Sequence, residues 1–245
     1  MTKRKLFTGV MSAVMLVGVV VSSTIYADAA TYSGQSNGSV SFKAGDLVLP
    51  PTTGPTTPPA SDFGLLYIPG EFNFEETSVP SSTVTANTFI NIDTNWEGSP
   101  AANTGGTGGS NPATKHVGIG DVRGTNAGWK LEAKLTNDLI DTGASKTLTG
   151  ATIEMSQTLK EITNPATGTL GTVVSTGLAP TVAATVSIGS GSTTSIMNAP
   201  ATKGQGYWNG EFTNIRLKIP AAAMNTVAAG EQYEGTVDWT LTDAP

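Results

Sequence analysis

Two short stretches of the chain place aromatic rings beside glycines and side-chain amides, a combination suited to holding sugar rings. Trp96 stands in the sequence Asn-Trp-Glu-Gly, next to a glycine-rich stretch, and Tyr207 and Trp208 follow Gly204 and Gly206. Loops are exposed, and glycine lets a ligand approach the backbone closely. We therefore hypothesise that Trp96, Tyr207 and Trp208 contact a glycan or a partner protein. The alternative is that these rings fold back and cap the core.

Asp121 and Arg123 are separated by one residue, so on a strand their side chains share a face. The following Gly124 and Thr125 indicate a turn. An arginine–carboxylate pair can fix a polar loop in place, or the arginine can bind a ligand carboxylate such as that of a peptide stem. We favour the structural pairing and keep the ligand-binding alternative.

The residues that usually carry catalysis or bind metals are sparse. His116 is the only histidine, and it lies beside a flexible, glycine-rich stretch rather than in a recognisable triad context. Acid pairs such as Glu75 and Glu76 would serve a glycosidase only at a suitable carboxylate separation, which sequence spacing does not establish. The aspartates lack the order of a calcium loop, and the chain has no cysteine to supply a thiolate. We expect no enzymatic activity, no cofactor and no metal site.

One tripeptide pattern occurs twice in strictly alternating apolar and polar runs. Trp129 and Leu131 belong to the first run, and Trp239 and Leu241 belong to the second, 110 residues further along. A period of two is the signature of a half-buried β-strand. A tryptophan on the apolar face of such a strand usually lies in the core, where its large ring is buried. We expect core positions for both rings; the alternative is an exposed aromatic platform for sugars.

The N-terminus has the order of a secretory signal peptide. A basic start at residues 3–5 is followed by an apolar run over residues 6–21 and by an Ala-x-Ala cleavage site at residues 27–29. The alternative, an uncleaved membrane anchor, fits less well because the apolar run is short for a membrane span. We predict cleavage after residues 1–29 and secretion. No other stretch is apolar enough to cross a bilayer.

Removal of this segment makes the chain more acidic. Three of the 13 basic residues and one of the 19 acidic residues lie in it, which leaves ten against eighteen and a net charge of −8. A domain of that charge is repelled by phosphate backbones and anionic lipid surfaces, so nucleic-acid binding is unfavourable. Without disulfides, the exported domain must depend on its apolar core.

The pattern along the mature chain predicts an all-β protein with long Gly- and Pro-rich loops. Residues 50–61 hold five prolines and read as a solvated spacer, residues 98–114 as a glycine-rich loop, and residues 221–229 as the one short helix. Many short strands separated by turn residues indicate a single β-sandwich or barrel-like domain. Strands are expected at residues 40–48, 65–68, 71–74, 89–92, 117–122, 129–135, 148–155, 182–188, 210–213, 214–219 and 233–241.

The two tryptophan runs carry a resemblance to a known family. The stretch from Val117 to Leu131, with its Asp-x-Arg-Gly-Thr lead-in, resembles the proximal signature of the WxL domain, and the stretch from Tyr233 to Pro245 resembles the distal signature. Together these features cover essentially all of the mature chain. We therefore divide the full chain into a signal peptide (1–29), an N-terminal strand with a Pro/Thr-rich segment (30–61) and a WxL β domain (62–245).

The resemblance implies a surface protein of low-GC Gram-positive bacteria. It implies non-covalent attachment to the cell wall, with peptidoglycan as the ligand, and assembly with other WxL proteins and a membrane-anchored partner. As an alternative, the chain would be a structural subunit of a surface complex that binds such a partner or host extracellular matrix. The chain shows no sorting motif, which agrees with attachment by binding alone.

Overall fold

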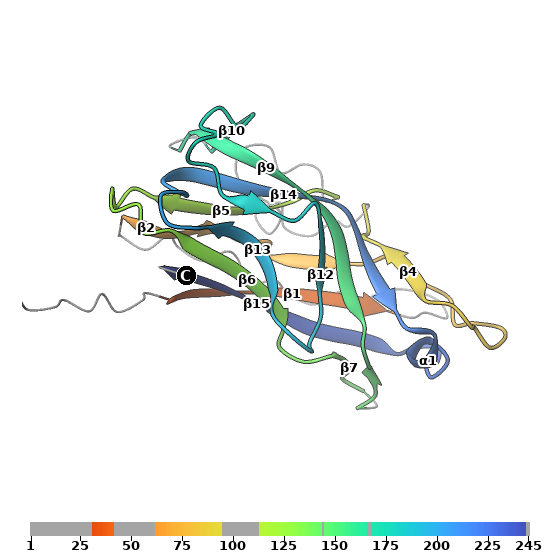
Figure 1. The fold of residues 1–245 in the computed structure, drawn as a ribbon. Helices are drawn as coiled ribbons and strands as arrows, with labels where there is room; N and C mark the ends of the chain where they lie inside the picture. The colour runs from red at the N-terminus through yellow and green to blue at the C-terminus, as the bar shows by residue number, and fades with distance from the viewer. Residues whose placement is uncertain (1–30, 42–61, 95–112, 144, 166–167, 244–245) are drawn as a thin grey trace, which may run out of the picture.

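The computed structural model describes residues 31–41, 62–94, 113–143, 145–165 and 168–243, which form two facing β-sheets with one helical turn (Figure 1). The prediction of an all-β, sandwich-like fold is confirmed. The predicted signal peptide, the Pro/Thr-rich segment, Trp96 and most of the glycine-rich loop lie outside the described residues.

The first sheet contains both tryptophan motifs. Its path runs through six strands, with β7 added beside β15 and β8 beside β7. In path order, followed by the two additional strands, the members are β11 (Thr181–Val182), β13 (Thr194–Ala199), β6 (Trp129–Leu135), β15 (Gln232–Asp243), β1 (Thr31–Ser41), β3 (Glu71–Asn73), β7 (Leu139–Asp141) and β8 (Thr147–Leu148).

The second sheet is built around one long central strand, β14. The short helix α1 (Ala221–Met224) follows β14 after Pro220, so the predicted helix is present but only one turn long. In path order, followed by the strand beside β9 and the strand beside β14, the members are β10 (Thr169–Gly171), β9 (Thr152–Asn164), β14 (Gly206–Ile219), β5 (Lys115–Asp121), β2 (Phe63–Tyr67), β12 (Thr185–Ile188) and β4 (Thr88–Asn91).

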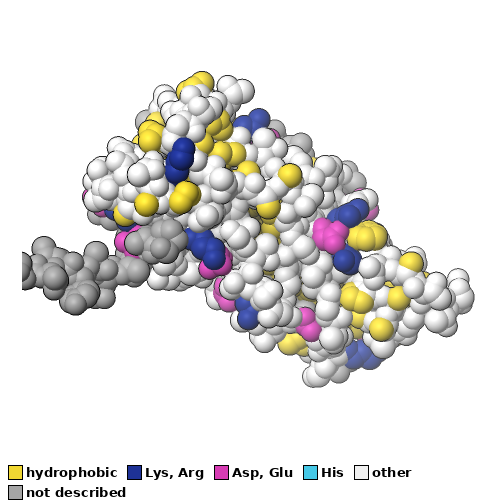
Figure 2. Space-filling model, in the orientation of Figure 1, with side chains coloured by type: hydrophobic (Ala, Val, Ile, Leu, Met, Phe, Trp, Pro, Cys, Tyr) yellow, Lys and Arg dark blue, Asp and Glu magenta, His cyan; other side chains and the backbone are white. Residues whose placement is uncertain are grey.

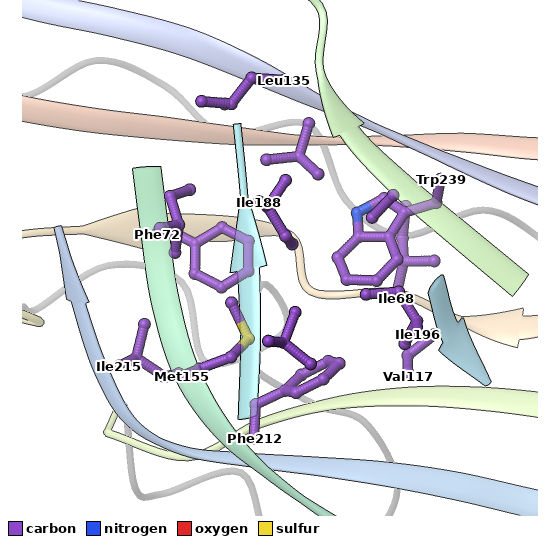
Figure 3. Packing of buried hydrophobic residues seen from close by; sticks show 14 of the residues in the cluster. Ile68, Phe72, Val117, Leu135, Met155, Ile188, Ile196, Phe212, Ile215 and Trp239 are labelled. Atoms are coloured by element: carbon purple, nitrogen blue, oxygen red, sulfur yellow. The ribbon is translucent and has the colours of Figure 1, made fainter. Parts of the chain in front are cut away.

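Apolar side chains from both sheets meet in one continuous core (Figure 3). On β6, buried and half-buried residues alternate along the whole strand, as the sequence pattern predicts. Contact across the layers is direct, since the rings of Phe212 on β14 and Trp239 on β15 lie 6.0 Å apart between centroids. Aromatic pairs at such distances add to the stabilisation that burial itself gives.

The first described strand is one that the sequence analysis does not predict. It is β1, which occupies Thr31–Ser41 and pairs with β15 along its full length, whereas the strand predicted over 40–48 lies outside the described residues after Ser41. The inward residues of β1 are small: Gly34, Ser36 and Gly38 are buried together with Val40. Small inward residues produce no alternation of apolar and polar side chains. The sequence pattern therefore does not predict this strand.

The central strand also differs from the prediction of two separate strands over 210–213 and 214–219. β14 runs without a break from Gly206 to Ile219, and its register against β9 shifts between Thr213 and Arg216. Asn214 has a φ of 51°, a left-handed conformation that asparagine tolerates better than most residues. A β-bulge therefore bends one strand at the place where the sequence suggests a boundary.

The sequence pattern does not predict the strand β13.

Two charged residues lie between the sheets. Lys115, at the start of β5, is 2 % exposed, and Glu71, at the start of β3, is 3 % exposed. Burial lowers the pKa of Lys115 to about 8, and the nearby charge of Glu71 opposes that change. Because the unfolded chain holds this proton more tightly, the ammonium form of Lys115 opposes folding at neutral pH.

We expect the free energy of unfolding to rise between about pH 8 and pH 10, the interval in which folded Lys115 has lost its proton and the unfolded chain has not. Urea unfolding at pH 7.5 and pH 9.5 measures this. The variant Lys115→Met should remove the rise. A rise of equal size in the variant would assign it to other groups.

Candidate functional site

The two tryptophan motifs lie side by side although 110 residues separate them. β15 pairs with β6 in antiparallel register, so that Leu241 lies opposite Leu131 and Trp239 opposite Ala133. The side chains of Trp129, Leu131, Trp239 and Leu241 are 0 % exposed. The prediction of core positions is confirmed, and neither indole forms an exposed platform for sugars.

Each buried indole has a hydrogen-bond acceptor for its N–H group. Trp239 donates to Ser36 Oγ at 2.6 Å, and Ser36 in turn donates to the carbonyl of Pro69. Trp129 and Trp208 donate to the same carbonyl, that of Gly204, at 3.1 and 2.9 Å. A buried N–H without an acceptor is costly, so these three bonds fix where the rings can lie.

The loop that carries the shared carbonyl is closely packed against the first motif. Gly204 has a φ of 84°, and a Cβ atom there would lie 2.3 Å from Nε1 of Trp129. Only glycine combines this backbone conformation with such a close approach. The Gly204–Gly206 stretch, which the sequence suggested as a ligand loop, therefore serves the packing of Trp129 and Trp208.

Arg123 joins the two motifs electrostatically. Its guanidinium contacts Asp121 through Nη2 at 2.9 Å and Nε at 3.0 Å, and it contacts Asp243 at the end of β15 through Nη1 at 3.2 Å. It also donates to the carbonyl of Gly128, just before Trp129, and lies 3.8 Å from the ring centre of Phe63. Hydrogen bonding to Asp121 raises the pKa of Arg123. Arg123 therefore pairs with carboxylates of the protein itself, which is the structural role that the sequence analysis favoured over binding a ligand carboxylate.

The hypothesis that three aromatic side chains lie exposed on loops has a different outcome for each of them. Trp208 is 1 % exposed and points into the core from β14, so the prediction of an accessible ring is wrong there. Tyr207, the preceding strand residue, faces the other way and is half-buried. Trp96 lies outside the described residues. The pattern misled because Tyr207 and Trp208 begin a strand rather than a loop.

Tyr207 belongs to a polar and aromatic area on the outer face of the second sheet. Gly118 and Gly120 of β5 leave space there: a Cβ at Gly118 would lie 2.4 Å from the ring of Tyr67, and one at Gly120 would lie 3.2 Å from that of Tyr207. Tyr67 donates to Asn209 Oδ1 at 2.9 Å. The glycines thus let both tyrosine rings lie flat against β5.

The only histidine lies on this same face, not in a catalytic arrangement. Nδ1 of His116 is 3.3 Å from the side-chain nitrogen of Asn209, and burial is the main cause of the lowered pKa of His116. The carboxylate of Glu211 acts in the opposite direction. At neutral pH the imidazole is therefore neutral, and it completes a hydrogen-bonded network rather than activating a nucleophile.

An open pocket of about 950 Å³ lies where β14 bends, and no sequence pattern indicated it. Its apolar floor consists of buried residues, among them Ile215 of β14, Met155 of β9 and Ile92 just after β4. Its walls are rich in uncharged hydrogen-bonding groups, and Asn214 donates to Ser156 Oγ at 3.2 Å across it. These polar wall residues are Asn91, Thr94, Ser156, Thr185, Ser187 and Asn214.

Three charged residues line the pocket, Glu75, Glu154 and Arg216, and Lys218 lies beside Glu154. Glu154 accepts hydrogen bonds from Arg216 at 2.9 Å and forms an ion pair with Lys218 at 3.2 Å, which lowers the pKa of Glu154 against the effect of its burial. Arg216 also lies 4.2 Å from the ring centre of Phe89, which is 46 % exposed. Acidic, basic and hydrophobic side chains accordingly adjoin one another on the surface near β4 (Figure 2). The pocket therefore favours a neutral ligand.

One serine has the spacing of a hydrolase nucleophile. Gly34, Ser36 and Gly38 match Gly-x-Ser-x-Gly, a match that our sequence reading overlooked. The structure places Ser36 in the middle of β1, fully buried, with its hydroxyl bonded to Trp239 and Pro69. A nucleophile elbow instead holds its serine exposed on a sharp turn between a strand and a helix. Ser36 is a structural residue.

Across the described parts of the chain, no group of three or more histidine or acidic side chains is placed to hold a metal ion. Within those same parts, no helix is long and apolar enough to cross a membrane.

We expect Arg123→Ala to lower the free energy of unfolding by about 2–4 kcal/mol, because it leaves Asp121 buried without its partner. Arg123→Lys should lose most of that stability as well, since a lysine cannot reach several acceptors at once. Urea unfolding measures both. Near-wild-type stability of Arg123→Ala would show that this contact network does not hold the motifs together.

Comparison with known proteins gives one match. The model of the WxL domain, described as surface cell wall-binding, matches residues 29–245. No curated protein and no solved structure matches the chain. The family match covers both tryptophan motifs and the strands that join them. The chain therefore belongs to the WxL domain family of surface cell wall-binding proteins.

Proposed function

We propose that this protein attaches non-covalently to peptidoglycan as a non-enzymatic protein of the bacterial cell surface. The observation that carries the proposal is the match to a cell wall-binding family over residues 29–245. The acidity of the chain supports recognition by local groups rather than by general attraction to anionic wall polymers. Secretion through the signal peptide at residues 1–29 is part of the same proposal.

The pocket at the bend of β14 is the best-suited site for the glycan strands of the wall. Its size is in the range of ligand pockets, and it offers amides and hydroxyls above an apolar floor. Hydroxyl-rich sugars need such donors and acceptors, and an N-acetyl methyl group suits an apolar floor. Because two carboxylates (Glu75 and Glu154) balance two cations (Arg216 and Lys218) around the pocket, an uncharged glycan costs less to bind than a charged peptide stem.

Tyr207 remains a second candidate contact, as does Trp96 from the sequence. The half-buried ring of Tyr207 lies on the outer face of the second sheet, where a sugar could stack against it. All four apolar side chains of the two motifs are buried, which supports a role in the fold rather than in direct contact with the wall. In this proposal the motifs support the fold, and the outer surface of the second sheet binds.

The alternative function is that of a structural subunit in a surface complex. It would bind a membrane-anchored partner, other WxL proteins or host extracellular matrix. The observation that favours it is the presence of two exposed apolar side chains, Val174 at 72 % and Leu178 at 38 %, on the connection between β10 and β11. An apolar surface that is exposed can mark a protein contact.

Retention on purified, protein-stripped peptidoglycan tests the proposal. We expect the mature protein to sediment with bare wall at moderate salt and to leave the turbidity of the suspension unchanged. Retention only after a partner protein is added would support the structural subunit instead. Falling turbidity would contradict the non-enzymatic assignment.

Variants of the pocket locate the binding site. The double variant Asn214→Gly with Ser156→Ala removes two polar groups from the pocket wall, and glycine keeps the left-handed backbone at position 214. We expect retention on bare wall to fall at least tenfold, with a melting temperature close to that of the wild type. Isothermal titration with a neutral N-acetylated oligosaccharide should show the same loss.

Ser195→Ala, an exposed change on β13 of the other sheet, is the matched control and should bind normally. Tyr207→Ala tests the second candidate contact in the same assay. Full retention of the pocket variant together with loss in Tyr207→Ala would move the site to the outer face of β5 and β14. Full retention of both would remove the two surfaces from the proposal.

A further inference from the structure

We propose that β1 is an exchangeable strand, and that residues 31–41 of one copy of this chain can occupy the place beside β15 in a second copy. The proposal concerns self-association and does not depend on wall binding. It rests on how β1 is held in the sheet, on what its place requires, and on the length of chain that joins it to the rest of the domain.

β1 lies inside the first sheet, between two other strands. It pairs with β15 in antiparallel register from Thr31 opposite Thr242 to Ser41 opposite Gln232, and with β3 in parallel register over three residues. Figure 1 shows it running alongside β15. Withdrawal of β1 would leave a place one strand wide, with unpaired backbone groups of β15 and β3 on either side. Such a place demands another strand.

Main-chain pairing and polar contacts, rather than apolar burial, hold β1 there. Val40 is its one buried apolar side chain among those the structure describes. The outward contacts are hydrogen bonds, such as Gln35 to Asp238 at 2.8 Å and Ser39 to Asn73 at 2.9 Å. A detached β1 would therefore expose little apolar surface of its own and would stay soluble. Detachment costs mainly backbone bonds, which the same strand regains in another copy.

The position beside β15 accommodates only a strand with particular residues, and β1 has these residues. Trp239 needs the hydroxyl of Ser36 for its indole N–H, and Ser36 needs the carbonyl of Pro69. At Gly38, a Cβ atom would make ordinary van der Waals contacts, 3.4 Å from the carbonyl oxygen of Phe72 and 3.6 Å from its Cβ, so a small residue fits this position. A strand with small residues around a central inward serine fits this place. Residues 31–41 of a second copy provide one, which is why we assign the occupant to this chain.

The covalent connection does not confine β1 to its own domain. Twenty residues, 42–61, separate Ser41 from Asp62. Fully extended, a segment of that length spans roughly 70 Å, more than the width of a domain of this size. Exchange of an identical element through a long connection is a low-cost route to association, because every contact in the assembled form already exists in the single molecule.

Cysteine pairing tests the exchange, and the natural chain contributes no cysteine of its own. Ser33 lies opposite Thr240 in the register of β1 and β15, at a separation that a disulfide can bridge. Two single variants of the mature protein, Ser33→Cys and Thr240→Cys, are mixed at high concentration, incubated and oxidised. Only a β1 seated in a different copy brings these two positions together. We expect disulfide-linked heterodimers, identified by mass spectrometry of the 33–240 peptide pair.

The control mixture combines Ser33→Cys with Ser195→Cys, an exposed position on β13 that is not opposite β1. We expect at least fivefold more heterodimer from the 33–240 mixture than from this control. Equal yields would overturn the proposal, since chance collisions would then explain both. The double variant Ser33→Cys/Thr240→Cys, oxidised at low concentration, should give a closed monomer that no longer associates. Association of this closed monomer to the wild-type extent would also overturn it.

Discussion

The contact between β6 and β15 is the constraint on which the rest of the domain depends. It brings together two segments more than a hundred residues apart and places Trp129 and Trp239 on the same side of one sheet. Around it, Arg123 joins Asp121 of the second sheet to Asp243 of the first, and the Gly204 carbonyl accepts from Trp129 and Trp208. The two layers are therefore joined at one end by charge and hydrogen bonding as well as by apolar packing.

This arrangement separates what the family motif does from what the protein binds. The motif side chains have no access to solvent, so they act on any ligand only through the fold. The open surface lies on the other sheet, where the β14 bulge forms a polar pocket and the glycines of β5 make room for Tyr67 and Tyr207.

The sequence was informative where one face of a strand is apolar and the other polar. The alternation of apolar and polar residues correctly predicted β6 and β15. The spacing of Asp121 and Arg123, with one residue between them, correctly predicted their ion pair. It failed for β1, whose buried residues are glycines and a serine, and for Trp208, whose glycine neighbours suggested a loop. The pocket could not be predicted, because it arises from a register shift that brings together residues of four strands. Such shifts are decided by tertiary packing rather than by local composition.

The order in which the strands are synthesised has a consequence for how the first sheet assembles. The first sheet joins residues 31–41 to residues 232–243, and the latter to residues 129–135. Its central strand is therefore translated after nearly all of its neighbours, and the contacts are overwhelmingly between distant parts of the chain. Chains with such distant contacts fold slowly. The chain loses the entropy of its large loops first, and the contacts that compensate for this loss form only afterwards. A nascent polypeptide of this design cannot complete its first sheet until its last strand has been synthesised, so the sheet assembles after translation rather than strand by strand.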